Sequence, residues 1–444
     1  MLKIHIYPDP NELINSGQLY ISATYKQILH IIRQSKYYEP DPKKACIFVT
    51  SYDTLDRDPL SIDYQKNLPR FLPVDNGQNH IILNLYSGSW PAYNEMDFGN
   101  FNPGLAMLVK ASIRNQDYRP DFDISLPLFS KTHPFRGDTL PISSGQSSAA
   151  LASPPKSYSI RYMNASNVAA TKLDNKNLLV FKGKRYIYGI GSETRNMLHH
   201  LDNREDILVF TTCKHGKKWK ELKDERCNTD NSEYDRFDYN HLMSNSTFCL
   251  VPRGRRLGSY RFLEALGSGC IPVVLSNDWV KPFSSVIDWS SIVIDGDERL
   301  LLNLPEILRS ISWRKISRMR SAGLRIYDKY FSSIEKIILT TIKILEQRIQ
   351  SQLSLNSFIW NVASPSALWF HNEFSSRLSD YPFANANQLT VPRRKEGYTA
   401  ITYVSKPVSP SIIFRLLKNL QRSEFSAKVG SALVRSFVCT EYQA

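Results

Sequence analysis

Two series of short apolar runs, each interrupted by segments of helical periodicity, constrain the fold of this chain more than any other feature. The runs of the first series are LKIHIYP from Leu2, ACIFVTS from Ala45 and HIILNLY from His80. The intervening segment QLYISATYKQILHIIRQS carries apolar residues at helical spacing. PGLAMLVKASIR from Pro103 is predicted to form another helix, because a proline stands in its first turn. Alternating strands and helices predict a parallel sheet covered by helices.

A second alternating series follows the first. It consists of NLLVFKGKRYIYGIG, SETRNMLHHL, DILVFTT, STFCLV, SYRFLEALGS and IPVVLS, and the long amphipathic helix SSIEKIILTTIKILEQRIQSQL closes it. We therefore predict an α/β fold with two Rossmann-like lobes in tandem. The first lobe spans 1–170, with a Ser/Ala/Pro-rich insertion at about 137–170, and the second spans 171–352. Residues 353–444 hold one more strand and helix pattern, YTAITYV and PSIIFRLLKNLQRS, which is too little to bury a core alone.

The charge of the chain predicts an anionic partner. The formal net charge is +14, which suits nucleic acid, a membrane face, an acidic polysaccharide or a phosphorylated donor. No helix-turn-helix, RNA-recognition or zinc module is present to favour nucleic acid. The start MLKIHIYPDP is not a signal peptide, and no run of about 18 apolar residues predicts a membrane span.

The six cysteines leave two interpretations open. None has the spacing of a zinc site. Cys213 with Cys227, and Cys249 with Cys270, are spaced to close short loops as disulfides, which would place the chain in an oxidising lumen. The alternative is a set of buried thiols in a cytosolic protein. Sequons at Asn164 and Asn245 fit a secretory route, although such triplets also arise by chance.

The segment PRGRRLGS, between a predicted strand and a predicted helix, is the first candidate site. Ligands of open parallel sheets bind beyond the carboxyl ends of the strands, which is where this segment falls. Arg253, Arg255 and Arg256 offer permanently charged donors suited to phosphate, and Gly254 and Gly258 allow close backbone approach. The following helix would present its free N–H groups to the same anion. The alternative is an arginine-rich loop that is merely solvated.

Two further groups could complete a nucleotide site. Arg261 and Glu264 share a face of the predicted helix, where Glu264 would reach ribose hydroxyls; the alternative is a surface ion pair. The turn GIGSETRN, at 189–196, matches only part of the dinucleotide fingerprint. Arg195 in this turn could meet a pyrophosphate, and the alternative is a helix-capping turn with an exposed arginine.

The first lobe offers candidates for the acceptor side. Asp53, Asp56 and Asp58 follow a predicted strand, where a general base for an acceptor hydroxyl could stand, although turn formation beside proline explains them equally well. Trp90 and Tyr93 could stack on a sugar, or could belong to the core.

Two more aspartates have the D-x-D spacing that holds a metal in many nucleotide-sugar enzymes. Asp295 and Asp297 stand isolated in a turn-like segment, however, and no metal site is predicted there.

Together these motifs give the chain a family resemblance. Residues 248–294, FCLVPRGRRLGSYRFLEALGSGCIPVVLSNDWVKPFSSVIDWSSIVI, strongly resemble the exostosin glycosyltransferases, the heparan sulfate polymerases. The likeness extends over roughly residues 2 to 350, through YDTLDRDPLS, NLYSGSWPAY, LVFKGKRYIYGIGSETRN, TTCKHGKKW and YFSSIEKIILTTI. The resemblance implies a GT-B fold, with a cleft between the two lobes. It also implies an inverting transfer of glucuronic acid from UDP-glucuronate to a terminal N-acetylglucosamine of the growing chain.

Further expectations come from the same resemblance. The donor-site residues fall on Arg195, Arg255, Arg261 and Glu264, and no metal or other cofactor is needed in this module. The tail from YTAITYV is similar to the start of the family's second transferase module. The family implies a type II membrane protein of the endoplasmic reticulum and Golgi lumen, whose anchor has no counterpart here, and a homologous exostosin subunit as partner. The alternative function is a non-catalytic, glycan-binding or stabilising subunit of a polymerase complex.

Overall fold

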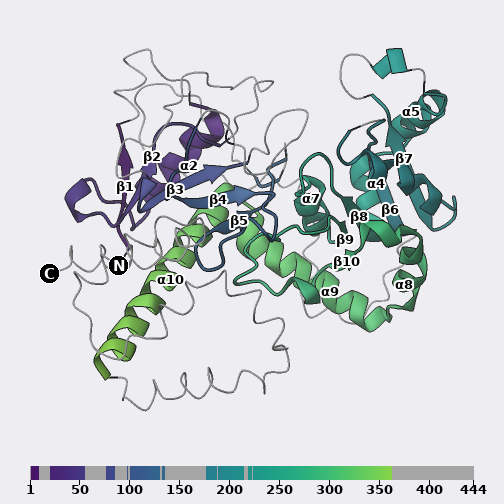
Figure 1. The fold of residues 1–444 in the computed structure, drawn as a ribbon. Coiled ribbons are helices and arrows are strands. Elements are labelled where there is room, and N and C mark those ends of the chain that lie inside the picture. Colours follow the sequence, from purple (N-terminus) through teal and green to yellow (C-terminus); the bar gives the residue numbers. More distant parts are fainter. Residues whose placement is uncertain are drawn as a thin grey trace, which may run out of the picture. The chain divides into compact units, whose positions relative to one another are not determined.

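The first sheet is formed by residues of the amino-terminal part of the chain. The computed structural model describes residues 2–9, 21–55, 77–85, 98, 101–130, 133–135, 177–187, 189–214, 219–222 and 224–362, with side chains up to residue 351. Five parallel strands lie in sequential order (Figure 1). They are β1 (Ile4–Tyr7), β2 (Ile47–Thr50), β3 (His80–Asn84), β4 (Met107–Ala111) and β5 (Ile124–Leu126).

Helix α2 (Ala23–Gln34) joins β1 to β2, as its helical periodicity predicts. Its first turn is capped by Ser22, whose hydroxyl accepts a hydrogen bond from the backbone of Tyr25. The buried side of the helix includes Ile28 and Ile32. A parallel connection through a helix is the expected βαβ unit.

The helix predicted from Pro103 is wrong, because this segment contains strand β4. All residues of β4 are buried, and a short apolar run that is buried on both faces cannot be told from a buried helix by its periodicity. Ile82 of β3 and Leu108 of β4 contribute to one small hydrophobic cluster with Phe98, Phe101 and Ala106. Pro103 therefore precedes β4, a strand in the interior of the sheet, and does not start a helix.

The second sheet is also parallel, but its strands do not lie in the order of the sequence. The order is β10-β9-β8-β6-β7, so β6 lies between β8 and β7. The strands are β6 (Asn177–Lys184), β7 (Ile207–Thr212), β8 (Ser246–Pro252), β9 (Ile271–Leu275) and β10 (Ile294–Gly296). Because the chain runs outward in both directions from β6, a topological switch point lies between β6 and β8.

Helices and short helical turns cover the second sheet. α7 packs on β8 and β9, α9 packs on β9 and α7, and α5 packs on β7. Leu179, Phe248 and Val273 belong to the buried core of this sheet. The helical elements are α4 (Ser192–Met197), η4 (Leu198–Leu201), η5 (Trp219–Leu222), α5 (Cys227–Arg236), α6 (Tyr239–Ser244), α7 (Arg261–Ser268), η6 (Trp289–Ser291), η7 (Glu298–Asn303), α8 (Leu304–Ser310), α9 (Trp313–Ile326) and the π-helical η8 (Tyr327–Phe331).

The two parallel sheets confirm the predicted α/β class with two Rossmann-like lobes, the organisation of the GT-B type. Both sheets belong to one compact unit, Lys3–Pro40 with Ile47–Ile342. The long helix predicted from Ser332 is present as α10 (Ile334–Val362). Strands β1–β5 fall within the predicted first lobe and β6–β10 within the second, while the exact lobe boundaries stay a prediction.

A second unit holds Met1–Leu2, Asp41–Cys46 and Lys343–Ala444. Its described part includes the short helix η1 (Pro42–Lys44), capped by the Asp41 carboxylate, and the latter part of α10. None of the described helices has both the length and the apolar character needed to cross a bilayer. The insertion at 137–170 and the patterns YTAITYV and PSIIFRLLKNLQRS lie outside the described residues.

Candidate functional site

Two loops meet at the carboxyl ends of the central strands of the second sheet. One follows β6 and contains Gly189 and Gly191; the other follows β8 and contains Gly254. A Cβ atom on Gly191 would approach the carbonyl oxygen of Gly254 to well inside 3.0 Å, so the two backbones are in direct contact. The positive φ of Gly191, 79°, further favours glycine. These loops flank the topological switch point, where ligands bind in open α/β sheets.

Arg195 connects the two loops from α4. Its Nη1 donates to the carbonyl oxygen of Lys184, at the end of β6, at 2.8 Å, and its Nε donates to that of Arg253, after β8, at 2.8 Å. The residue is only 8% exposed, and burial lowers the pKa of Arg195 to about 10, so the guanidinium stays charged at neutral pH. Arg195 is therefore a buried residue that joins the two loops. It is not the exposed arginine of the alternative interpretation.

Tyr186 lies between two arginines at this site. The guanidinium carbon of Arg195 is 4.8 Å from the centroid of its ring, and that of Arg255 is 5.5 Å away. A Cβ atom on Gly254 would meet the Tyr186 hydroxyl at 2.9 Å. Sequence reasoning missed Tyr186, although an aromatic residue between a strand and a glycine turn is a visible signal in GKRYIYGIG.

The arginines of the PRGRRLGS segment have different surroundings. Arg253 donates from Nε to the Gly254 carbonyl at 3.4 Å, and its terminal nitrogens have no partner among the described residues. Arg256 donates to the carbonyl of Leu85 at 3.0 Å, and the nearby Gly258 N–H donates to the hydroxyl of Ser112 at 3.0 Å. The loop therefore also contacts residues that follow β3 and β4 of the first sheet, within the same compact unit.

Arg261 and Glu264 of α7 do not pair with each other. The guanidinium of Arg261 lies over the Phe181 ring, 4.5 Å from its centroid, and Nη2 donates to the carbonyl of Lys182. Within the described part of the chain, its Nε is buried and has no hydrogen-bond partner. Glu264 accepts a hydrogen bond of 2.6 Å from the Tyr239 hydroxyl. Burial raises the pKa of Tyr239, so this hydroxyl keeps the proton that it donates.

The acceptor-side candidates are only partly described. Asp56, Asp58, Trp90 and Tyr93 lie outside the described residues. Asp53 is described, and its carboxylate accepts backbone hydrogen bonds of 2.9 Å from both Ser22 and Leu55. This arrangement supports the turn-forming interpretation of Asp53, because the carboxylate holds two loop segments together.

A buried polar pair in the first sheet escaped sequence reasoning. Lys110 of β4 is 0% exposed and donates to the Asn84 side chain at the end of β3 at 2.6 Å. Its ammonium also lies 4.9 Å from the centroid of the Phe98 ring. The signal for this buried pair was a lysine inside the apolar run PGLAMLVKASIR. It was overlooked because the segment was predicted to be a helix.

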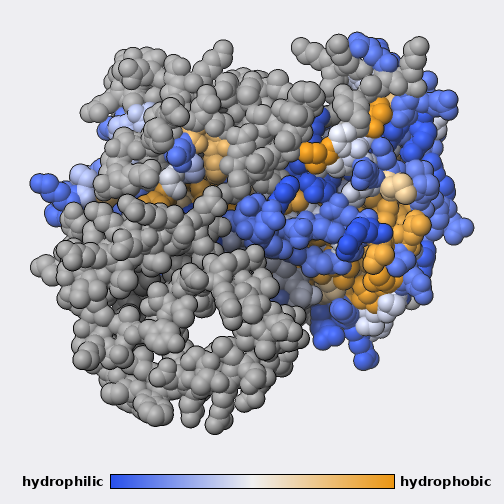
Figure 2. Space-filling model, in the orientation of Figure 1, coloured by the Kyte–Doolittle hydropathy of each residue, from blue (hydrophilic) through white to orange (hydrophobic). Residues whose placement is uncertain are grey.

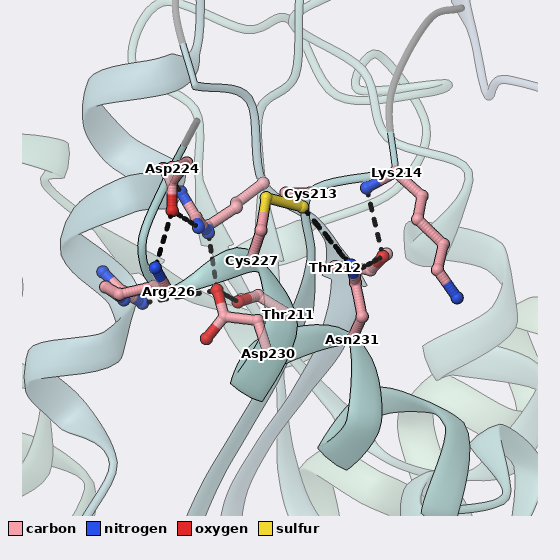
Figure 3. Close-up of a disulfide and its surroundings, with 10 residues drawn as sticks. Thr211, Thr212, Cys213, Lys214, Asp224, Arg226, Cys227, Asp230 and Asn231 are labelled. Carbon is pink, nitrogen blue, oxygen red and sulfur yellow. Dashed lines mark hydrogen bonds and ion pairs between the residues drawn. A yellow bond between two sulfur atoms is a disulfide. The ribbon is translucent and has the colours of Figure 1, made fainter. Parts of the chain in front are cut away.

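The second sheet carries both predicted disulfides. Cys213 pairs with Cys227 and Cys249 with Cys270, with Cα atoms 5.6 Å and 5.8 Å apart. Figure 3 shows the first disulfide with Asp224, Asp230 and Thr211 around it. Arg185 donates hydrogen bonds of 2.6–2.8 Å to Asp224 and of 2.6 Å to Asp230, and Thr211 also donates to Asp230. The Arg185 bond holds the pKa of Asp224 below its ordinary value. The disulfide joins the residue after β7 to the start of α5, and Arg185 links the end of β6 to the same helix through Asp230.

The two carboxylates of the D-x-D segment are each paired with a basic side chain. Asp295 is 2.7 Å from the ammonium of Lys281, and Asp297 is bonded to Arg299. Among the residues that the structure describes, no cluster of three or more His, Cys, Asp and Glu side chains could hold a metal ion.

The sequon residues also have defined places where they are described. Asn245 ends α6, and its side chain contacts His241 at 3.0 Å. Asn164 lies outside the described residues. Glycosylation at either position stays a prediction.

The sequence of this chain matches the model of a known protein family. The model of the Exostosin GT47 domain matches residues 1–311. The chain belongs to the exostosin family. Exostosin-1b of Danio rerio is 46% identical over 433 residues, and Exostosin-1 of Mus musculus is 45% identical over 433 residues. In both comparisons 96% of this chain and 54% of the relative are covered. This exostosin-family chain thus spans about half the length of the curated relatives it matches.

A solved structure of an α1,3-fucosyltransferase is also similar to this exostosin-family chain. The TM-score is 0.30 with 13% sequence identity, and the match covers 78% of this chain and 90% of the other. A similarity at this level carries no conclusion about the site.

Proposed function

We propose that this chain is an inverting glucuronosyltransferase of heparan sulfate elongation. It transfers glucuronic acid from UDP-glucuronate to a terminal N-acetylglucosamine of the growing chain. The observation that carries the proposal is the contact of two glycine loops at the switch point between β6 and β8, with Arg253 and Arg255 on one of them. Family membership supports a nucleotide-sugar donor for this site.

In the proposed reaction an acceptor hydroxyl attacks the anomeric carbon of the donor. The bond from that carbon to the diphosphate oxygen breaks, and UDP leaves with the electron pair. Arg253 and Arg255 stabilise the negative charge that develops on the diphosphate, because guanidinium groups form strong charge-assisted bonds to phosphate. The hydroxyl proton passes to a base, for which Asp56 and Asp58 are the candidates from the sequence. A single displacement inverts the anomeric configuration.

The other charged residues of the site have supporting roles in this proposal. Arg195 holds the two loops in register through its bonds to backbone carbonyls. Arg261 fixes the start of α7 against β6. Glu264 accepts from the ribose hydroxyls of the donor, in addition to its bond from Tyr239. Trp90 and Tyr93 remain the proposed acceptor-binding residues.

The cellular setting is part of the same proposal. Two disulfides support an oxidising compartment, and we place the chain in the lumen of the endoplasmic reticulum and Golgi. A homologous exostosin subunit is the proposed partner. Neither a metal nor another cofactor is assigned to this module.

A transfer assay tests the proposed activity. Purified protein is incubated with UDP-glucuronate or UDP-N-acetylglucosamine and a heparosan oligosaccharide that ends in N-acetylglucosamine, and the product linkage is determined by NMR. We expect a β-linked glucuronic acid from UDP-glucuronate only. The variant Arg253→Ala/Arg255→Ala should lose transfer, while Arg236→Ala, an exposed arginine on α5, should retain it. Binding of donor and acceptor without turnover would instead indicate a non-catalytic subunit.

A further inference from the structure

The exposed face of α9 carries an unusual concentration of positive charge. Arg314, Arg318 and Arg325 are all exposed. At 100° per residue they fall on one side of the helix, and they extend over about 16 Å at 1.5 Å per residue. The opposite side of α9 is used for packing, with Met319 and Gly323 buried. The three guanidinium groups therefore form a straight cationic stripe, which we call the α9 stripe.

No carboxylate of the described residues neutralises the α9 stripe. None of its arginines takes part in an ion pair there, although Arg299 and Arg309, which precede α9 in the chain, are each paired with an aspartate. The fourteen residues of α9 include no acidic residue. The stripe thus presents its full charge to the surroundings.

Helix energetics do not explain this distribution. Arg314 stands in the first turn, where the positive end of the helix dipole disfavours cations. Arg314 and Arg318 are four residues apart, a spacing at which like charges repel. Only Arg325, in the last turn, interacts favourably with the dipole. An external anion would compensate for the unfavourable placement of the first two.

We propose that the α9 stripe binds a linear polyanionic glycan, the part of the acceptor chain that lies away from its reacting end. This inference rests on the proposed function for the identity of the glycan. Uronic acid residues recur along such a chain, so a row of guanidinium groups can bind successive carboxylates. Trp313, which is 54% exposed beside Arg314, offers an aromatic ring for a sugar at one end of the stripe.

The geometry favours a glycan over a lipid surface. A helix that docks on a membrane buries its apolar face in the bilayer, whereas the apolar face of α9 packs on β9 and α7. Between the arginines of the stripe lie small residues, Ser321 and Ala322. Hydrophobic surface gathers instead over α8 and its neighbours, orange in Figure 2, with Leu300, Leu302 and Ile307 exposed on η7 and α8. That surface makes anionic vesicles a necessary arm of the test.

Binding to long heparosan chains and to a heparosan tetrasaccharide tests the proposal. The variant Arg314→Gln/Arg318→Gln/Arg325→Gln neutralises the stripe with a residue of similar helix propensity. The matched control Lys26→Gln/Lys36→Gln/Lys43→Gln removes the same charge from exposed positions elsewhere. We expect affinity for long chains to fall about tenfold or more in the stripe variant, with a weaker salt dependence, because fewer charge contacts form. The control should bind like the wild type, and the tetrasaccharide should show no difference.

Three results would overturn the proposal. One is equal binding of long chains by wild type and stripe variant, and another is an equal loss in both variants. The third is selective loss of binding to phosphatidylserine/phosphatidylcholine vesicles with glycan binding unchanged. UDP binding and transfer to the tetrasaccharide should be the same in the stripe variant and the wild type. Failure of the proposed enzymatic function would therefore appear in the wild type itself, separately from the effect of the stripe.

Discussion

Gly191 and Gly254 are in backbone contact although they lie 63 positions apart in the sequence, and a Cβ atom on Gly191 would collide with the backbone of Gly254. Gly191→Ala should therefore destabilise the protein and weaken nucleotide binding, because both steric contact and the left-handed backbone oppose a side chain. We expect a loss of about 2–4 kcal/mol in unfolding free energy, measured by denaturant titration. Gly189→Ala is the control: its φ is 87°, but a Cβ atom there would meet nothing within 4 Å. Equal losses in both variants would contradict an effect of the contact.

Arg195 and Arg253 should have separable roles. Arg195→Ala removes bonds to carbonyls that are then left buried, and should cost about 2–4 kcal/mol of stability. Arg253→Ala should leave thermal stability nearly unchanged and weaken UDP binding, because its terminal nitrogens bond to no described residue. Thermal melts with and without UDP separate the two effects. A stable Arg195→Ala variant with weakened UDP binding would reassign Arg195 as a direct ligand contact.

The ion pair of Arg185 with Asp224 should make stability depend on pH. The pKa of Asp224 is lowered from an ordinary value of 3.8. The pair therefore contributes its full stabilising free energy at pH values well above 3.8. Its contribution is lost as the pH falls through the lower pKa of the folded state. Asp224→Asn should cost about 2–4 kcal/mol at pH 7, and its difference from the wild type should shrink at pH 3.

Urea denaturation at both pH values measures this difference. Asp235→Asn is the control, since Asp235 and its partner Lys214 are both exposed, and it should change stability by less than about 1 kcal/mol. A difference between wild type and Asp224→Asn that is constant with pH would rule out the titration of Asp224 as its cause.

The disulfide between Cys249 and Cys270 should stabilise the second sheet directly, since it joins β8 to the residue before β9. Cys249→Ser/Cys270→Ser should lower the unfolding free energy by on the order of 3 kcal/mol, the value for a loop of similar length. Dithiothreitol should lower the melting temperature of the wild type and leave that of the variant less affected. Identical melting of the two proteins under oxidising conditions would contradict a stabilising role.

The sequence predicted the second sheet and its central strands well, since β6, β7, β8 and β9 are apolar runs with clear boundaries. Strand β4 was mistaken for a helix because burial on both faces removes the alternation that distinguishes a strand. β10, only three residues long, carried too little pattern to be found. Short elements of this kind depend on tertiary contacts for their formation.

At the site, the sequence predicted the two loops after β6 and β8, because glycines and arginines follow a strand in each. It did not predict which groups each side chain contacts. Arg195 binds carbonyls of two strands that are distant in sequence, so its burial was not visible locally. Tyr186 was visible as an aromatic residue beside the glycine turn, but its contacts with Arg195 and Arg255 were not. The cysteine pairs were predictable because each closes a short loop.

Isothermal titration with UDP tests the central claim most directly, since the claim is that Arg253 and Arg255 bind a nucleotide diphosphate at the carboxyl ends of β6 and β8. The wild type and the Arg236→Ala control should bind UDP alike, and Arg253→Ala/Arg255→Ala should bind it about tenfold or more weakly. Equal affinity in all three proteins would contradict the account.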